Sequence, residues 1–274
     1  MFISRGHKSF HASLGPKLGL LLMAAMLLTG CPVSQKPGSG TQLTLKEAQT
    51  NTPYYLYLPA GYDPNKRLPL VLTIHAIKPF DSAERQIREW QSTADKYGLI
   101  VVAPVVGNIN MLLMLPLNQI TAGVKREEQA VISILDEALS DTAADPDRVL
   151  MTGLSSGGFL MHYLVNKYPE RFAALCSRCC NGNTAILNED NARAMAARNF
   201  PVMIYYAEYD SPDVKFDSFR AIRWYRKMGF KVETMVVPQT IRLPGLGLGH
   251  VEGARPDIAA EFFLRSTQPT RASQ

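Results

Sequence analysis

The chain has 274 residues, of which 46% are hydrophobic and 19% are charged. This composition supplies a large buried core and excludes disorder of the whole chain. The formal net charge is +5, but Arg5, Lys8 and Lys17 belong to an N-terminal segment that precedes the folded part. Because the remaining basic residues form no clustered stripe, we expect no nucleic-acid partner.

The N-terminus has the parts of a bacterial export signal in the usual order. Basic residues come before an apolar run at residues 18–28, which is too short to span a bilayer, since that takes about 20 residues. The run ends in LTGC at residues 28–31, which resembles the lipoprotein box. The resemblance implies cleavage before Cys31 and diacylglycerol on its sulfur. An ordinary signal peptide with a coincidental cysteine is the alternative.

These signals define the expected domain organisation. Residues 1–30 are the signal peptide, residues 31–42 a flexible tether rich in Pro, Gly and Ser, residues 43–268 the catalytic domain, and residues 269–274 a tail. We expect the membrane to be contacted through the lipid anchor only. Pro32 stands where an Asp often retains lipoproteins at the inner membrane. The expected location is therefore the bacterial cell envelope, with the outer membrane or the cell surface favoured.

Strand and helix patterns alternate after the tether. The expected strands are 44–49, 54–58, 68–74, 99–105, 148–153, 172–176, 201–206 and 231–237. The expected helices are 82–97, 127–139, 157–168, 214–228 and 257–264. Repeated strand–helix units predict an α/β fold with a mostly parallel central sheet and helices on both faces.

The chemical signal is centred on Ser155, in the run GLSSGG at residues 153–158. Gly153 and Gly157 flank the serine at two residues on either side, with a strand expected before it and a helix after it. A sharp strand-to-helix turn needs small neighbours around an exposed hydroxyl. We therefore predict that Ser155 is a nucleophile. A purely structural turn is the alternative, and Ser156 does not fit the spacing.

A serine nucleophile needs a base. His75 ends a strand, and His162 lies inside an expected helix, where it packs or faces solvent. His250 lies in a glycine-rich loop before the last helix. Only His250 follows the chain order of serine, acid and histidine that this type of turn carries.

The acid should follow a strand between the serine and the histidine. The strand at 201–206 is followed by Ala207-Glu208-Tyr209-Asp210. Asp210 is the predicted acid, which would hold the imidazole tautomer. Asp213 and Glu208 are the alternatives, and a capping or turn role for Asp210 also stays open.

Several motifs in order carry a family resemblance. The chain resembles the polyhydroxybutyrate depolymerase and feruloyl esterase group of α/β-hydrolases over roughly residues 44–265, on the motifs at residues 55–63, 68–71, 145–149, 153–158 and 168–174. The resemblance implies the α/β-hydrolase fold and ester hydrolysis through an acyl-enzyme. It implies no metal and no cofactor.

The resemblance also implies an oxyanion hole made of backbone N–H groups. One donor is Ser156, the residue after the nucleophile. The other comes from the loop at His75, where relatives usually have His-Gly and this chain has Ala76 and then Ile77. Alanine adopts positive φ less readily than glycine. Either Ala76 or Ile77 is the second donor, and His75 would then orient the loop.

Two further features have open interpretations. The apolar segment 111–117 forms either a substrate wall or lid, or a helix packed into the core. Cys176, Cys179 and Cys180 are either buried thiols or include one disulfide, because export permits oxidation. A zinc site is not expected, because no second ligand pair accompanies the C-x-x-C spacing.

The expected substrate is a small-molecule or polymer ester, such as a hydroxyalkanoate or a feruloyl or acetyl ester of a polysaccharide. A serine peptidase and a lipase use the same fold and nucleophile. A non-catalytic lipoprotein that binds a ligand at the cell surface is the third alternative, favoured by Ala76. The sequence does not indicate an oligomeric state.

Overall fold

The computed structural model describes residues 38–107, 116–238, 250 and 254–267. The expected signal peptide, Cys31, the tail and most of the apolar segment 111–117 lie outside these residues. Among the helices that are described, none combines the length and the hydropathy needed to cross a membrane.

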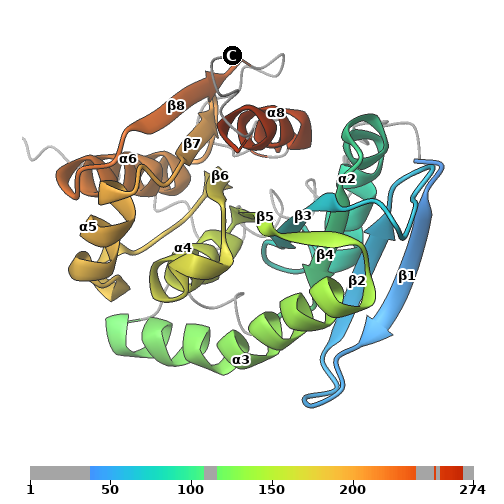
Figure 1. Cartoon of the computed structure of the whole chain (residues 1–274). Coiled ribbons are helices and arrows are strands. Elements are labelled where there is room, and N and C mark those ends of the chain that lie inside the picture. The colour runs from blue at the N-terminus through green and yellow to red at the C-terminus, as the bar shows by residue number, and fades with distance from the viewer. Residues whose placement is uncertain (1–37, 108–115, 239–249, 251–253, 268–274) are drawn as a thin grey trace, which may run out of the picture. The chain divides into compact units, whose positions relative to one another are not determined.

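The described residues form an eight-stranded sheet in the order β1-β2-β4-β3-β5-β6-β7-β8 (Figure 1). β1 and β2 are antiparallel to their neighbours, and the other strands are parallel to one another. The strands are β1 (Thr41–Lys46), β2 (Pro53–Leu58), β3 (Leu68–Ile74), β4 (Ile100–Pro104), β5 (Ala144–Ser155), β6 (Ala174–Cys180), β7 (Val202–Ala207) and β8 (Val232–Val237).

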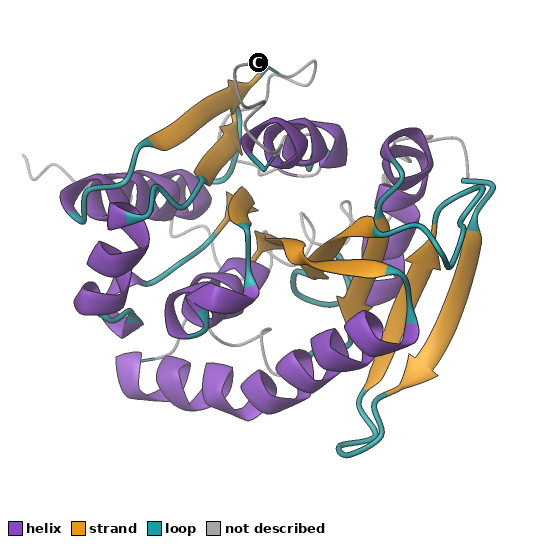
Figure 2. Cartoon of the chain, viewed as in Figure 1, coloured by secondary structure: helices purple, strands orange, loops and turns teal. Residues whose placement is uncertain are grey.

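Helices cover both faces of this sheet (Figure 2). One hydrophobic core lies between the sheet and α2 (Ala83–Tyr97) with α8 (Pro256–Ser266). A second core lies on the other face, under α3 (Leu117–Asp141), α4 (Gly157–Lys167), α5 (Glu189–Ala197) and α6 (Pro212–Lys227). Short 3-10 turns occupy Pro169–Arg171 and Thr184–Ile186. Burial on both faces explains why the central strands are continuous apolar runs.

The helix boundaries follow local capping signals. The Ser82 side chain accepts a hydrogen bond from the Arg85 N–H at the start of α2, and Gly98 ends this helix with a left-handed φ of 64°. Helix α3 begins at Leu117, ten residues before the expected start at residue 127. Its first turns are weakly amphipathic, and burial of Ile120 and Val124 in the core stabilises them.

The chain joins the domain earlier than its composition indicates. β1 begins at Thr41, and the preceding glycines are held in place by hydrogen bonds. The Gly38 N–H donates to Gln91 Oε1 at 3.3 Å, and the Gly40 N–H donates to the Tyr57 hydroxyl at 2.8 Å. Residues 38–42, expected in the tether, are therefore part of the fold.

Candidate active site

Ser155 lies at the sharp turn between β5 and α4, as the spacing of glycines predicts. Its φ is 51°, a left-handed conformation that side chains rarely adopt. A Cβ added at Gly157 would lie 2.5 Å from the Ile74 carbonyl oxygen, so only glycine fits there. The close approach of α4 to β3 therefore fixes the turn that presents the Ser155 hydroxyl.

A β-bulge lies in the strand next to this turn. Leu154 pairs with Arg178 and Ser155 pairs with Cys180, which leaves Cys179 as the extra residue. Cys179 has a left-handed φ of 49°. Bulges next to active sites redirect side chains, and this one changes which residues of β6 face the end of β7.

The bulge also brings Asn181 to the nucleophile. The Asn181 N–H donates to the Ser155 carbonyl at 2.9 Å, and its side-chain Oδ1 lies 3.5 Å from Ser155 Oγ. Its Nδ2 donates to Asp213 at 3.1 Å and to Asp217 at 3.3 Å. Asn181 was not predicted from the sequence. Its position just after a strand that neighbours β5 was the available signal.

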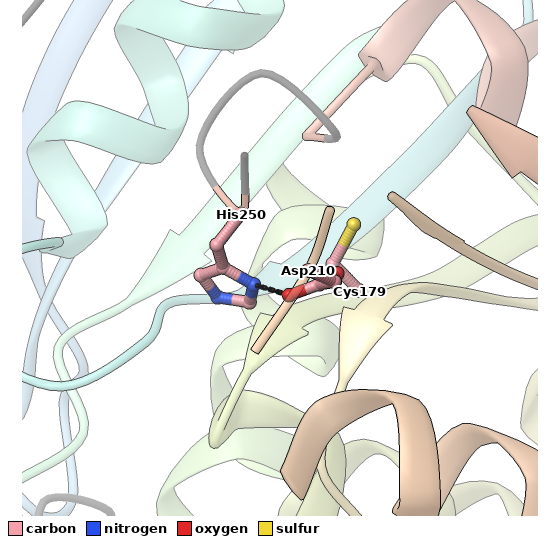
Figure 3. Close-up of side chains that lie close together, drawn as sticks. All are labelled: Cys179, Asp210 and His250. Carbon is pink, nitrogen blue, oxygen red and sulfur yellow. Dashed lines mark hydrogen bonds and ion pairs between the residues drawn. The ribbon is translucent and has the colours of Figure 1, made fainter. Parts of the chain in front are cut away.

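Asp210 and His250 form a hydrogen-bonded pair (Figure 3). Asp210 Oδ1 accepts from His250 Nδ1 at 2.7 Å, and the same carboxylate accepts the N–H groups of Ser211 at 2.8 Å and Ala207 at 3.1 Å. These backbone donors hold the carboxylate in place after β7. The structure therefore brings the predicted acid and base together, although they are 40 residues apart.

The electrostatics of the pair favour a charged histidine. Burial alone lowers the pKa of His250, but the hydrogen bond and the negative charge of Asp210 outweigh it and raise the pKa above its usual value. His250 Nε2 is buried, and it has no hydrogen-bond partner among the described residues. This nitrogen is therefore free to accept a proton. Ser155 Oγ does not bond to it in this structure; such bonds often form only when substrate binds.

The alternative acids do not bond to His250. The Asp213 carboxylate accepts from Asn181, and His250 Nδ1 is bonded to Asp210 rather than to Glu208. His162 is buried on α4, where Nδ1 lies 2.9 Å from the Tyr225 hydroxyl. Neither the two carboxylates nor His162 shares the contact between Asp210 and His250.

Cys179 lies beside this pair (Figure 3). Its sulfur, an Asp210 oxygen and a His250 nitrogen lie within 4.8 Å of one another. Burial raises the pKa of the Cys179 thiol well above its usual value, so the thiol keeps its proton. His250 Nδ1 is already bonded to Asp210, so these donors suit a hydrogen-bonded cluster better than a metal. Cys176, Cys179 and Cys180 are all buried free thiols. Of the two alternatives, buried thiols or one disulfide, the structure therefore has the first.

The loop after β3 has a different arrangement from the one expected. The Ala76 N–H donates to Asp81 Oδ2 at 2.7 Å, which disfavours it as the oxyanion donor. His75 Nδ1 lies 2.6 Å from the Ala76 carbonyl oxygen, and the Val106 N–H donates to His75 Nε2 at 3.1 Å. Burial lowers the pKa of His75, so the ring is neutral. His75 therefore orients the loop, and Ile77 remains as a candidate donor.

A hollow of about 510 Å³ adjoins the acid on the side of α6. Its lining mixes aromatic and charged residues: Glu208, Tyr209, Asp210, Pro212, Lys215, Phe216 and Phe219. The two phenylalanines are exposed on the surface of α6.

With this geometry established, comparison with known proteins gives the family. The family model for esterase PHB depolymerase matches residues 52–211, more than half of the chain. This chain belongs to that family. The match spans the strand before Ser155, the nucleophile turn and Asp210, and the family resemblance found from the sequence motifs is confirmed.

Curated relatives of this chain are similar over part of their length. A bifunctional acetylxylan esterase/xylanase of Neocallimastix patriciarum is 24% identical over 162 residues, which cover 58% of this chain and 21% of the relative. A poly(3-hydroxybutyrate) depolymerase of Ralstonia pickettii is 31% identical over 135 residues, which cover 44% of this chain and 27% of the relative. The chain thus spans about a quarter of the length of these two relatives.

Solved structures support the fold. A ferulic acid esterase from Anaeromyces mucronatus, in complex with ferulic acid, aligns with a TM-score of 0.60 at 12% identity. The alignment covers 84% of this chain and 93% of that chain. The predicted α/β-hydrolase fold, with a mostly parallel sheet and helices on both faces, is confirmed.

Proposed function

We propose that this chain hydrolyses carboxylic esters through an acyl-enzyme on Ser155. The observation that carries the proposal is the Asp210–His250 pair, with a 2.7 Å hydrogen bond on Nδ1 and a free Nε2. Membership of an esterase family supports the reaction type. The strained turn at Ser155 supports the choice of nucleophile.

The proposed reaction has two proton transfers at His250. His250 Nε2 takes the Ser155 hydroxyl proton as the oxygen attacks the ester carbonyl, and Asp210 stabilises the imidazolium that forms. The imidazolium then protonates the leaving alcohol. A water molecule, activated by the same nitrogen, attacks the acyl-enzyme and releases the acid together with the free Ser155 hydroxyl.

We assign the oxyanion hole to the N–H groups of Ser156 and Ile77. A trans peptide places its C=O and N–H on opposite sides. The Ala76 carbonyl is held by His75, whose ring also bonds to Val106 after β4. β4 and β5 lie on opposite sides of β3. The Ala76 carbonyl and the Ile77 N–H belong to the same peptide. Because the carbonyl is held toward β4, the Ile77 N–H points toward β5, which ends at Ser155.

The substrate class follows from the family and its relatives. Their names refer to acetylxylan, feruloyl and poly(3-hydroxybutyrate) esters. We propose an ester of a short acyl or aromatic acid carried on a polymer or on its fragments. A serine peptidase would cleave peptides instead, and a lipase would prefer long acyl chains. A substrate series with graded acyl length, plus a peptide, separates the three.

We also propose that residues 1–30 are a signal peptide and that Cys31 carries a lipid. The order of basic residues, apolar run and LTGC supports this proposal. Relatives named feruloyl esterase B and poly(3-hydroxybutyrate) depolymerase are compatible with export. The anchor would hold the enzyme at the bacterial cell envelope, with the outer membrane or the cell surface favoured.

A fluorophosphonate probe tests the catalytic proposal directly, because it reacts with an activated serine. The wild-type chain should be labelled, and Ser155→Ala should not. Ser218→Ala is the control: Ser218 is a buried serine on α6, and its loss should leave labelling intact. A folded wild-type chain without labelling would favour a non-catalytic binding lipoprotein instead.

A further inference from the structure

Asp81 lies at the centre of the loop that follows β3. It is 4% exposed, and its carboxylate accepts the Ala76 N–H at 2.7 Å. The Asp81 N–H in turn donates to the Ile77 carbonyl oxygen at 3.0 Å. Asp81 therefore bonds to the His75–Ala76 peptide and to the Ile77–Lys78 peptide, which flank the peptide that carries the Ile77 N–H.

A chain of buried hydrogen bonds, here called the relay, also holds the Asp81 carboxylate. Gln86 Nε2 donates to Asp81 Oδ2 at 2.9 Å. The orientation of the Gln86 amide is fixed, because its Oε1 accepts from the Thr73 hydroxyl at 2.9 Å and from Arg178. An amide whose oxygen is occupied by donors can only present its NH₂ group to Asp81.

The relay begins at a buried cation. Arg178 on β6 is completely buried, and its Nε donates to the Thr152 hydroxyl at 3.1 Å. A buried charge is costly unless an opposite charge or hydrogen bonds compensate it. Glu89 Oε2, 3.9 Å from Arg178 Nη1, supplies an opposite charge, and Gln86 links Arg178 to Asp81 through hydrogen bonds.

We propose that Asp81 is a positioning residue for the oxyanion hole. Its carboxylate takes the Ala76 N–H, so the loop keeps its shape with alanine where relatives usually have glycine, and the Ile77 N–H is left directed at the reacting carbonyl. Gln86 and Arg178 hold Asp81 in that role. This inference rests on the proposed ester hydrolysis, and it adds residues that do not touch the substrate.

The kinetic test uses Asp81→Ala and Asp81→Asn on a short aryl ester. Losing one oxyanion donor costs about 100-fold in kcat. We expect a loss of that size in Asp81→Ala with KM within about twofold of the wild type, because the donor acts on the transition state. The asparagine keeps an oxygen that can accept the Ala76 N–H, so its loss should be about tenfold smaller.

The matched control is Asp95→Ala. The Asp95 carboxylate also accepts backbone N–H groups, from Ser39 at 2.7 Å and from Ala60 at 2.7 Å. The segments that carry these two N–H groups are not part of the site. It should lose stability without losing kcat. Equal kcat in Asp81→Ala and the wild type would overturn the inference. If Asp81→Ala does not fold, Gln86→Ala replaces it, and an unchanged kcat in that variant would overturn the inference as well.

Amide hydrogen exchange separates this inference from the catalytic proposal. In Asp81→Ala the Ala76 amide should exchange faster than in the wild type, and in Asp95→Ala it should not change. If the wild type is inactive but shows this exchange pattern, ester hydrolysis would be refuted and the proposed role of Asp81 in holding the loop would be supported. If the wild type is active and Ala76 exchanges at the same rate in Asp81→Ala, the proposed role of Asp81 alone would be refuted.

Discussion

Ser155 and Cys179 lie on neighbouring strands, β5 and β6, and both have left-handed backbones, with φ of 51° and 49°. The two strained residues have linked consequences. The turn at Ser155 presents the proposed nucleophile, and the bulge at Cys179 brings Asn181 against it. The same bulge places a thiol against the Asp210–His250 pair. Strain of this kind persists only where the surrounding packing enforces it.

Cys179→Val should therefore be destabilising. Valine is branched at Cβ and rarely adopts a positive φ, so we expect a loss of about 2 kcal/mol in the free energy of unfolding, relative to a control. The control is Cys176→Val, at another fully buried cysteine of the same strand that lies in regular β-structure. Urea unfolding measures both. Equal losses would show that the left-handed backbone at Cys179 is not a constraint.

Gly157→Ala should disrupt the nucleophile turn. The added methyl would lie 2.5 Å from the Ile74 carbonyl oxygen and 2.7 Å from that of His75, and neither backbone can move without shifting β3. We expect a loss of about 3 kcal/mol in unfolding free energy and loss of fluorophosphonate labelling. Gly107→Ala is the control, because its nearest neighbour would be 3.9 Å away. A Gly157→Ala variant as stable and as reactive as wild type would contradict the geometry.

The pH dependence should report His250 as the base. Only the neutral imidazole accepts the Ser155 proton, so kcat/KM should fall as the pH drops through the His250 pKa. Asp210 raises this pKa above its usual value of 6.5, which puts the midpoint of the loss above pH 6.5. A profile that stays flat from about pH 5 to 8 would rule out His250 as the base.

Asp210→Asn should remove both the orientation and the charge that the histidine depends on. We expect kcat to fall on the order of 10⁴-fold, and the acid-side midpoint of the residual activity to move to lower pH. Glu208→Gln is the matched control, because Glu208 lies two residues away on the same loop but does not bond to His250. Stopped assays with an aryl ester measure both; equal activity in the two variants would exclude Asp210 as the acid.

His162 should make the fold sensitive to acid. Burial lowers the pKa of His162 to about 4 from its usual value of 6.5. The unfolded chain therefore binds the extra proton first as the pH falls, and stability is lost below about pH 6.5. For this group the loss between pH 7 and pH 5 is about 2 kcal/mol. Urea unfolding of His162→Gln at both pH values should show a weaker pH dependence than wild type; an identical dependence would contradict this assignment.

Several features of this chain could be predicted from local sequence. The alternation of apolar strands and amphipathic helices indicated the fold, because each pattern follows the period of its own element. Ser155 could be identified because its glycines act on residues only two positions away. Asp210 could be preferred as the acid because it follows a strand that lies between the serine and the histidine in the chain. Helix α5 and the early start of α3 were missed, since their stability comes from packing against the core.

The tertiary structure decided what the local pattern could not. That Asp210, rather than Glu208 or Asp213, bonds to His250 depends on where the end of β7 lies relative to a distant loop. The carboxylate of Asp81 accepts the Ala76 N–H and so disfavours one of the two candidate oxyanion donors that the sequence left equal. Asn181 lies beside Ser155 only because Cys179 bulges. Local sequence determined the turn that carries the nucleophile, whereas contacts between residues far apart in the chain determined its partners.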